Sequence, residues 1–426
     1  MAVPSVREWL DVTRPREVWL VTGAHAVNEF YSVALPPILP LLVTDFNISY
    51  GEAGALLTVY FVMYSVFQLP AGFLADRVGQ RRILAGGMAV MAVGLAIASV
   101  AESYLVLFAG QVVAGIGGST YHPSGMSLIS DLETGSTEGT AMGIHGLGGV
   151  TGTALAPALI GGLAVLFDWR LALGTGAAVG VGYAALFLIF FPTTAVDGDR
   201  EDPRADGTGT GNGTANGPSN EGLRALLTDP WGSLITFPLR WWVLALFVTN
   251  LLIALEMGAV RTFTTTYLFD RTGESTSLSN AVFFVMLVGG GISSLAAGGL
   301  ADRFDRRALG ATTLAASAVA IGLTAVLPDS TAVFFVWFFL LGLVMYAVFP
   351  AMNALTSSYS DRSFSGSLFG VMLTAGSLGG AVGPLVVGVL AERFGMTRAF
   401  PWIAVTSVLG VISFLWLFRL SPDGKG

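Results

Sequence analysis

GFLADRVGQRR, at residues 72–82, returns later in the chain as GGLADRFDRRA, at residues 298–308. At this spacing of 226 residues the following pairs coincide: Gly72 with Gly298, Asp76 with Asp302, Arg77 with Arg303, and Arg81 with Arg307. Further pairs follow at a spacing of 227: Gly115 with Gly342, Pro123 with Pro350, Gly143 with Gly370, Gly152 with Gly379, and Pro157 with Pro384. Because these matches occur in the same order in both halves at a nearly constant spacing, the second half of the chain repeats the first. Paired halves are a recurring transporter architecture with the substrate site between them.

The composition places both halves in a membrane. Hydrophobic residues make up 53% of the chain and charged residues only 12%, against about 25% charged in a soluble domain. Apolar stretches of about 20 residues, enough to cross a bilayer, recur along the chain. We predict spans at 17–43, 49–75, 81–101, 103–130, 138–167, 169–192, 238–269, 277–301, 307–328, 331–358, 366–391 and 398–420. The prediction is an all-α polytopic membrane protein of about twelve helices, six in each half.

Basic residues predict the orientation, because cytoplasmic loops are enriched in Lys and Arg. With both termini in the cytoplasm, sixteen of the 21 basic residues fall on the cytoplasmic side. The opposite side has only Arg170, Arg271, Arg393 and Arg398. We therefore expect a multi-pass protein of the plasma membrane with both termini cytoplasmic.

One long segment has no apolar periodicity. Residues 195–222 are rich in Gly, Asp, Asn and Thr, so they cannot bury a core and should form a disordered cytoplasmic linker. We accordingly divide the chain into an N-terminal six-helix bundle at 1–194 and a C-terminal six-helix bundle at 223–426.

The doubled loop, the six-plus-six arrangement and the linker resemble the major facilitator superfamily over essentially the whole chain. The second loop departs from that pattern at Asp305, where Gly is expected. The stretch GIGGSTYHPSGMSLIS and the glycine-rich stretch after it resemble, more narrowly, the fosmidomycin-resistance-type and drug-efflux branch. The resemblance implies secondary active transport by alternating access.

The repeated loop also has a physical rationale. Asp76 follows the end of an apolar span, where the helix dipole is already negative, so it needs a positive partner elsewhere. The resemblance implies that such loops latch the two halves together on the cytoplasmic side. Gly72 and Gly79 permit close approach and a tight turn. The expected gating residues are Gly72, Asp76, Arg77, Gly79, Arg81, Gly298, Asp302, Arg303 and Arg307, and the alternative is that the arginines only determine topology.

A second glycine series resembles the antiporter signature of the superfamily. It consists of Gly143, Gly152, Ala156 and Pro157 in the fifth span, and of Gly370, Gly379, Gly383 and Pro384 in the eleventh. Small residues at this spacing let helices pack closely, and proline allows a bend. The series favours export mildly, with plain helix packing as the alternative.

Polar groups inside the spans are few, and each is costly in the bilayer. A charged carboxylate near its centre costs about 2.5–3.5 kcal/mol. Glu29 in the first span and Glu256 in the seventh are symmetry mates, because they lie 227 residues apart. Either one could carry a proton in a central cavity, or make a structural hydrogen bond to a neighbouring helix.

Other polar side chains accompany these glutamates. His25 shares a helix face with Glu29, and the other two histidines, His122 and His145, also fall inside spans. Arg261 could pair with Glu256 or bind an anionic substrate. The predicted proton-coupling and substrate-cavity residues are His25, Asn28, Glu29, His122, His145, Glu256, Arg261 and Asn353; the predicted packing and bend residues are Gly152, Pro157, Gly379, Gly383 and Pro384.

Three function classes follow from the sequence. The first is a proton-coupled exporter of a small molecule, the second an importer of an organic anion or nutrient, and the third a non-transporting receptor or scaffold. We expect no enzyme activity and no ATP-driven pumping, since no nucleophile–base set and no phosphate-binding loop is present. We also expect no cofactor, metal site or nucleic-acid partner. The expected partners are a small-molecule substrate, protons and the lipid bilayer, and the expected state is a monomer.

The linker generates one prediction. A flexible chain between two bundles needs reach, which grows with the square root of its length, but no particular sequence. Replacing residues 200–217 by a Gly/Ser segment of equal length should leave transport by correctly inserted protein nearly unchanged. Loss of transport in that variant would mean that the acidic residues of the segment bind a partner or regulate the protein.

Overall fold

The computed structural model describes residues 12–133, 137–192, 241–273, 275–301, 305–358 and 365–419, and every regular element in them is a helix. Twelve of their helical segments are long and apolar enough to cross a membrane. This confirms the predicted all-α, twelve-helix fold. The expected linker at 195–222 lies outside the described residues.

The first six spans are built from the elements α1 to α9. These are α1 (Pro15–Ser32), η2 (Pro36–Ile38), α2 (Leu39–Phe46), α3 (Tyr50–Val78), α4 (Gln80–Ser99), α5 (Tyr104–Gly118), α6 (Tyr121–Leu132), α7 (Glu138–Ala156), η3 (Pro157–Gly161), α8 (Gly162–Leu166) and α9 (Trp169–Phe190).

The last six spans are built from α13 to α20. These are α13 (Trp241–Thr272), α14 (Thr276–Ala301), α15 (Arg306–Leu323), η4 (Thr324–Val326), α16 (Thr331–Tyr346), α17 (Val348–Ser358), α18 (Ser365–Phe394), α19 (Met396–Ala399), η5 (Phe400–Ile403) and α20 (Ala404–Arg419).

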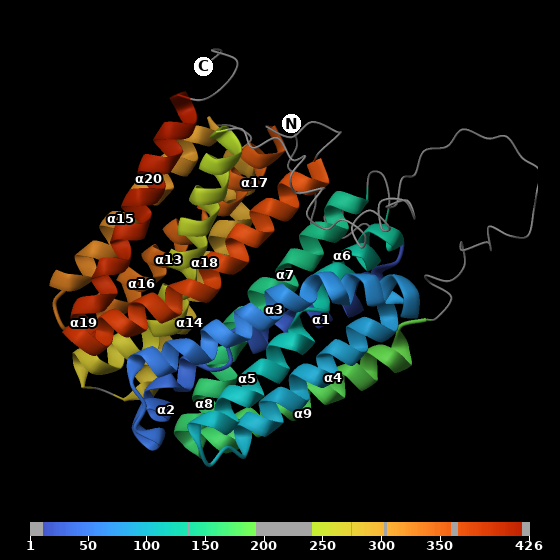
Figure 1. Ribbon diagram of the computed structural model, residues 1–426, viewed down its shortest axis with the longest axis horizontal. Coiled ribbons are helices and arrows are strands. Elements are labelled where there is room, and N and C mark those ends of the chain that lie inside the picture. Colours follow the sequence, from blue (N-terminus) through green and yellow to red (C-terminus); the bar gives the residue numbers. More distant parts are fainter. Residues whose placement is uncertain are drawn as a thin grey trace, which may run out of the picture.

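The helices gather into two bundles, α1 to α9 and α13 to α20, which lie side by side (Figure 1). Between the bundles, α3 packs along α18, and α7 packs against α14. We call the end of the molecule where α1 begins and α20 ends the terminal end. The opposite end, which holds α2 and α19, is called the far end. The two bundles diverge toward the terminal end (Figure 1).

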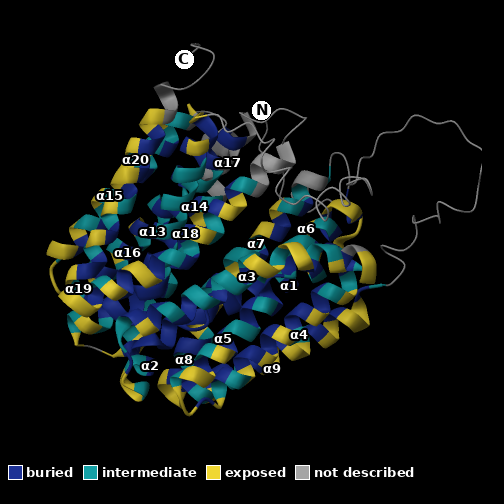
Figure 2. Cartoon of the chain, viewed as in Figure 1, coloured by how far each residue is buried: buried dark blue, intermediate teal, exposed yellow. Residues whose placement is uncertain are grey.

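Apolar side chains cover the outer surface as well as the core. Leu105, Leu166, Ile189 and Trp402 are each at least 65% exposed, while buried residues fill the middle of each bundle (Figure 2). Exposed apolar surface on this scale is typical of a protein whose outer solvent is lipid.

Several of the predicted spans are interrupted within the described residues, and the fourth and fifth show the reasons most clearly. The span predicted at 103–130 divides after Gly118, where the Ser119 and Thr120 hydroxyls donate to the backbone carbonyls of Ile116 (2.6 Å) and Gly117 (2.9 Å). The span at 138–167 changes at Pro157 into a π-helical turn, η3. Proline has no backbone N–H to donate, so one hydrogen bond of the helical ladder is missing at this position. Pro384 lies inside α18, which continues past it as an α-helix.

Glycines set the distance between paired helices. A Cβ added at Gly152 of α7 would overlap the carbonyl oxygen of Ala26 in α1, and one added at Gly379 of α18 would overlap that of Leu251 in α13. Gly383 meets α13 in the same way at Leu255. The two halves thus use matching glycines for matching helix pairs. These glycines fit the close-packing role of small residues in membranes.

These contacts predict a difference between two glycines of one helix. Gly152→Ala should destabilise the protein by about 1–3 kcal/mol, because overpacking must push α1 and α7 apart. Gly143→Ala is the matched control, since no described atom outside its own stretch of helix backbone lies within 4 Å of its added Cβ. Thermal unfolding of the two purified variants in detergent measures the difference. Equal stability of the two would contradict the packing role of Gly152.

Candidate functional site

A cavity of about 400 Å³ lies between the two bundles. This volume is in the range of small-molecule sites. Its polar lining residues are Glu29, Ser32, Tyr64, Gln68 and His122 from one half, and Asn250, Arg261, Thr262, Thr356 and Ser377 from the other. Phe61, Met257, Phe349, Met372 and Leu373 are among the apolar lining residues. The cavity therefore combines polar side chains from both halves with an aromatic and aliphatic wall.

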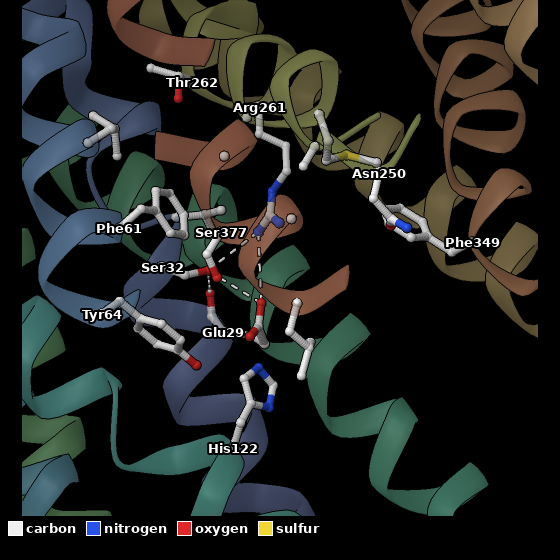
Figure 3. Close-up of a pocket in the computed structure, with 18 of the residues that line it drawn as sticks. Glu29, Ser32, Phe61, Tyr64, His122, Asn250, Arg261, Thr262, Phe349 and Ser377 are labelled. Carbon is white, nitrogen blue, oxygen red and sulfur yellow. Dashed lines mark hydrogen bonds and ion pairs between the residues drawn. The ribbon is translucent and has the colours of Figure 1, made fainter. Parts of the chain in front are cut away.

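An ion pair crosses this cavity from one half to the other. Arg261 points from α13 toward Glu29 and Ser32 of α1 (Figure 3). Its Nη2 lies 4.0 Å from Oε2 of Glu29 and donates to the Ser32 hydroxyl at 3.4 Å. The Glu29 and Arg261 side chains are 20% and 18% exposed. The pair is therefore loose, and it remains in contact with the cavity.

Glu256 does not share this site, which corrects the expectation that both glutamates face the cavity. It is buried, and its carboxylate accepts hydrogen bonds from Ser317 of α15 and from Ser407 at 2.5 Å, in α20. Glu256 and Arg261 are five positions apart in α13, so their side chains point about 140° apart around the helix. Because Arg261 faces the cavity, Glu256 must face the interior of its own bundle. Arg261 accordingly pairs with Glu29 and not with Glu256.

The three histidines gather behind Glu29. The His25 ring stacks on His145 with centroids 4.3 Å apart and on Tyr121 at 4.9 Å. His122 lies edge-on to His25 at 6.0 Å. His122 lines the cavity, whereas His145 is buried. The histidines predicted from three separate spans thus form one cluster next to Glu29.

One hydrogen bond fixes the orientation of the His25 ring. Its Nδ1 lies 2.9 Å from the backbone oxygen of His145. A carbonyl oxygen only accepts, so Nδ1 carries the hydrogen. The other nitrogen, Nε2, lies 4.0 Å from Oε1 of Glu29. A second proton on His25 would therefore be placed against the Glu29 carboxylate.

Asn28 supports the same carboxylate from the protein side. It is fully buried, and its amide donates to Oε1 of Glu29 at 3.1 Å and to the Tyr64 hydroxyl at 3.3 Å. Tyr64 itself lines the cavity. The sequence prediction of Asn28 as a cavity residue therefore needs adjustment, because Asn28 acts from behind the lining.

The repeated loops are described only in part. Gly79 lies between α3 and α4 and has φ = 98°. This backbone conformation favours glycine. Arg81 donates from Nε to the backbone oxygen of Phe191 at 2.9 Å and also to that of Leu188. Arg81 thus binds the carbonyl end of α9, a favourable place for a cation. Arg77 is exposed.

The structure gives a role to Asp305, the residue at which the second loop departs from the family pattern. The Asp305 carboxylate accepts from the backbone N–H groups of Arg307 (2.9 Å) and Ala308 (2.8 Å). Asp305 is therefore the N-cap of α15, a role that aspartate performs well. The predicted residues Asp302 and Arg303 lie outside the described residues, and so do the side chains of Asp76 and Asn353 and the surroundings of Gly298.

Contacts at the far end join the two halves. The Gly51 N–H of α3 donates to Oε1 of Glu392 in α18 at 2.9 Å. Tyr50 donates to Asp270, and further along α3, away from this end, Thr58 donates to the backbone oxygen of Ala381 at 2.6 Å. The bundles are thus closed at the far end and diverge at the terminal end. Sequence reasoning did not select Glu392 or Asp270, because a carboxylate near a span end is ordinary without knowledge of its partner.

Comparisons with known proteins agree with this architecture. The family model described as Major Facilitator Superfamily matches residues 19–289 and 246–426. The MFS-type transporter YfnC of Bacillus subtilis is 26% identical over 400 residues, 92% of this chain and 90% of that protein. The multidrug resistance protein MdtG of Dickeya zeae is 25% identical over 410 residues, 94% of this chain and 92% of that protein.

Solved structures show the same fold. A bacterial homologue of the human lysosomal transporter Spinster, in an inward-facing and occupied conformation, superposes with a TM-score of 0.77. It is 16% identical, over 95% of this chain and 98% of its own. The nucleoside transporter NupG has a TM-score of 0.75 at 13% identity, over 95% of this chain and all of its own.

The far-end contacts predict a way to open that end. Glu392→Ala removes the carboxylate from the positive end of α3, which should weaken the closure by about 1 kcal/mol, or roughly fivefold in population. The chain has no cysteine, so Ser377→Cys gives a single reporter on the cavity wall. Labelling of this reporter from the far-end side should be several times faster with Glu392→Ala. Glu102→Ala, in an exposed loop at the same end, is the control, and equal rates in both would contradict the closure role.

Proposed function

The chain belongs to the major facilitator superfamily, and from this membership we propose that it exports small molecules in exchange for protons. It is a multi-pass membrane transporter and not an enzyme. In the proposal the two bundles rock about the cavity and expose it alternately to either side. The single observation that supports proton coupling is that Glu29 of one half contacts Arg261 of the other inside the cavity.

Protonation of Glu29 would change what holds the halves together. The ionised carboxylate attracts Arg261 across the cavity, and this attraction is strong where water is scarce. A protonated Glu29 leaves only the hydrogen bonds of Ser32 and Asn28 at that point. Among the described residues, the titratable or charged groups around Glu29 are His25, Tyr60, Tyr64, Tyr121, His122, Arg261 and Tyr346. Proton uptake by this group would therefore bias the two bundles toward a different arrangement.

The direction of transport rests on orientation and relatives. If the terminal end faces the cytoplasm, as the basic residues predict, the bundles diverge toward the cytoplasm and are closed toward the outside. A cavity in this arrangement would load its substrate from the cell interior. The similarity to MdtG, whose name describes multidrug resistance, favours export over import.

Arg261 supports a second candidate, the uptake of an organic anion. An anion bound at Arg261 would displace Glu29, and the displaced carboxylate would then bind a proton more readily. Proton and anion would consequently bind together and move in the same direction. The sign of the coupling therefore separates the two candidates.

Everted membrane vesicles with an acidified interior provide the test. Compounds that raise the melting temperature of the purified protein are added outside, and a pH-sensitive dye reports the gradient. Exchange should dissipate the gradient, since each entering substrate releases a proton. If a compound binds the protein but enters the vesicles together with protons, the result would instead support the second candidate, the uptake of an organic anion.

Two glutamate variants form a matched pair in this assay. Glu29→Gln should abolish gradient dissipation while substrate counterflow at high concentration persists, because the amide cannot release a proton. Glu256→Gln should behave like the wild type in transport, since Glu256 lies outside the cavity. Proton-driven transport in Glu29→Gln at the wild-type rate would refute the assignment of Glu29.

A further inference from the structure

The charges of the cavity point to a particular class of substrate. Resting on the proposed function, we propose that the substrate is an amphipathic zwitterion whose positive group takes the place of Arg261 beside Glu29 and whose negative group takes the place of Glu29 beside Arg261. Its apolar body would lie against the aromatic and methionine wall of the same cavity.

The first support is the balance of charge. Among the described residues that line the cavity, Glu29 and Arg261 are the charged ones, one of each sign. A ligand with a single charge would neutralise one of them and leave the other without a partner, which is costly in a site of low dielectric. A zwitterion that separates the pair satisfies both. The cavity therefore matches a dipolar ligand better than an anion or a cation.

The second support is the looseness of the pair. Glu29 and Arg261 are 4.0 Å apart, longer than a charge-assisted hydrogen bond of about 2.7–2.9 Å. Within the described residues, the buried Nε of Arg261 has no hydrogen-bond partner. A planar acidic group could bind the guanidinium through two parallel hydrogen bonds. A ligand would thus gain contacts that the pair itself does not use.

The third support is the position of the pair in the two halves. Glu29 belongs to α1 and Arg261 to α13, so a ligand inserted between them contacts both bundles. Apolar residues line the cavity from both bundles as well: Phe61 of α3 from one, and Met257 of α13 and Phe349 of α17 from the other. The apolar body of the ligand would be enclosed from both sides.

This arrangement also gives the sign of coupling that export requires. A proton on Glu29 removes the negative partner of the ligand's positive group. Proton and zwitterion therefore exclude each other from the same carboxylate. Competition of this kind is what exchange needs, whereas a simple anion at Arg261 would bind together with the proton.

A series of four probes with one aromatic body tests the proposal. These are biphenylalanine as the zwitterion, the amine that lacks its carboxyl group as the cation, its N-acetyl acid as the anion, and its N-acetyl methyl ester as the neutral form. Calorimetric titration of the full chain in detergent at constant neutral pH measures binding without any gradient. The wild type should bind the zwitterion at least about tenfold more tightly than each other probe.

Charge variants should change this order in opposite ways. Glu29→Gln should lose the preference for the zwitterion and favour the anion, and Arg261→Gln should favour the cation. With both substitutions the neutral probe should bind best. Glu256→Gln, the carboxylate outside the cavity, should keep the wild-type order and so controls for folding.

Several results would overturn the proposal. These are equal or tighter binding of a singly charged probe by the wild type, an order unchanged in the two charge variants, or no binding of any of the four probes. Loss of proton-driven transport in Glu29→Gln with an unchanged probe order would leave the proton role of Glu29 intact and refute the zwitterion site alone. Retention of proton-driven transport in Glu29→Gln together with the expected change in probe order would refute the proton role of Glu29 and keep the zwitterion site.

Discussion

The contact between Glu29 and Arg261 is the interaction on which the site depends. In a bilayer a charge without a partner is expensive, and these two residues are paired only because the halves of the chain face each other. Either residue alone would be an unpaired charge that destabilises its own bundle. Together they place one negative and one positive group in a cavity that both halves enclose. In the proposed mechanism, the same contact would connect the arrangement of the bundles to the protonation of one carboxylate.

The rest of the fold keeps this contact in place. Matching glycines, Gly152 in one half and Gly379 in the other, bring α7 onto α1 and α18 onto α13. These pairs contain the two helices that bear Glu29 and Arg261. Behind Glu29, Asn28 and the stacked ring of His25 limit where the carboxylate can turn. Close packing thus defines the geometry of the site around Glu29 and Arg261.

The two ends of the molecule are joined by different chemistry. At the far end, Glu392 and Asp270 of one half meet the start of α3 in the other. At the terminal end, Arg81 binds the carbonyl end of α9 within its own half. In the proposed mechanism the first kind of contact would break when the halves rock, whereas the second would not. Charged side chains at helix ends would then serve in two ways, as a link between the halves that can be released and as a lasting contact within one half.

The sequence by itself determined the membrane class, the twelve spans and the repeat, because apolar length and a regular spacing are properties of the chain alone. It also predicted that Glu29, Arg261 and the three histidines matter, since polar groups inside apolar spans are few. It could not distinguish Glu29 from Glu256, which are equivalent by symmetry of position. Only the tertiary structure decided that Glu29 faces the cavity and Glu256 faces two serines. The reason is physical: sequence spacing gives the angle between two residues of one helix, but the neighbours of that helix decide which side is the cavity.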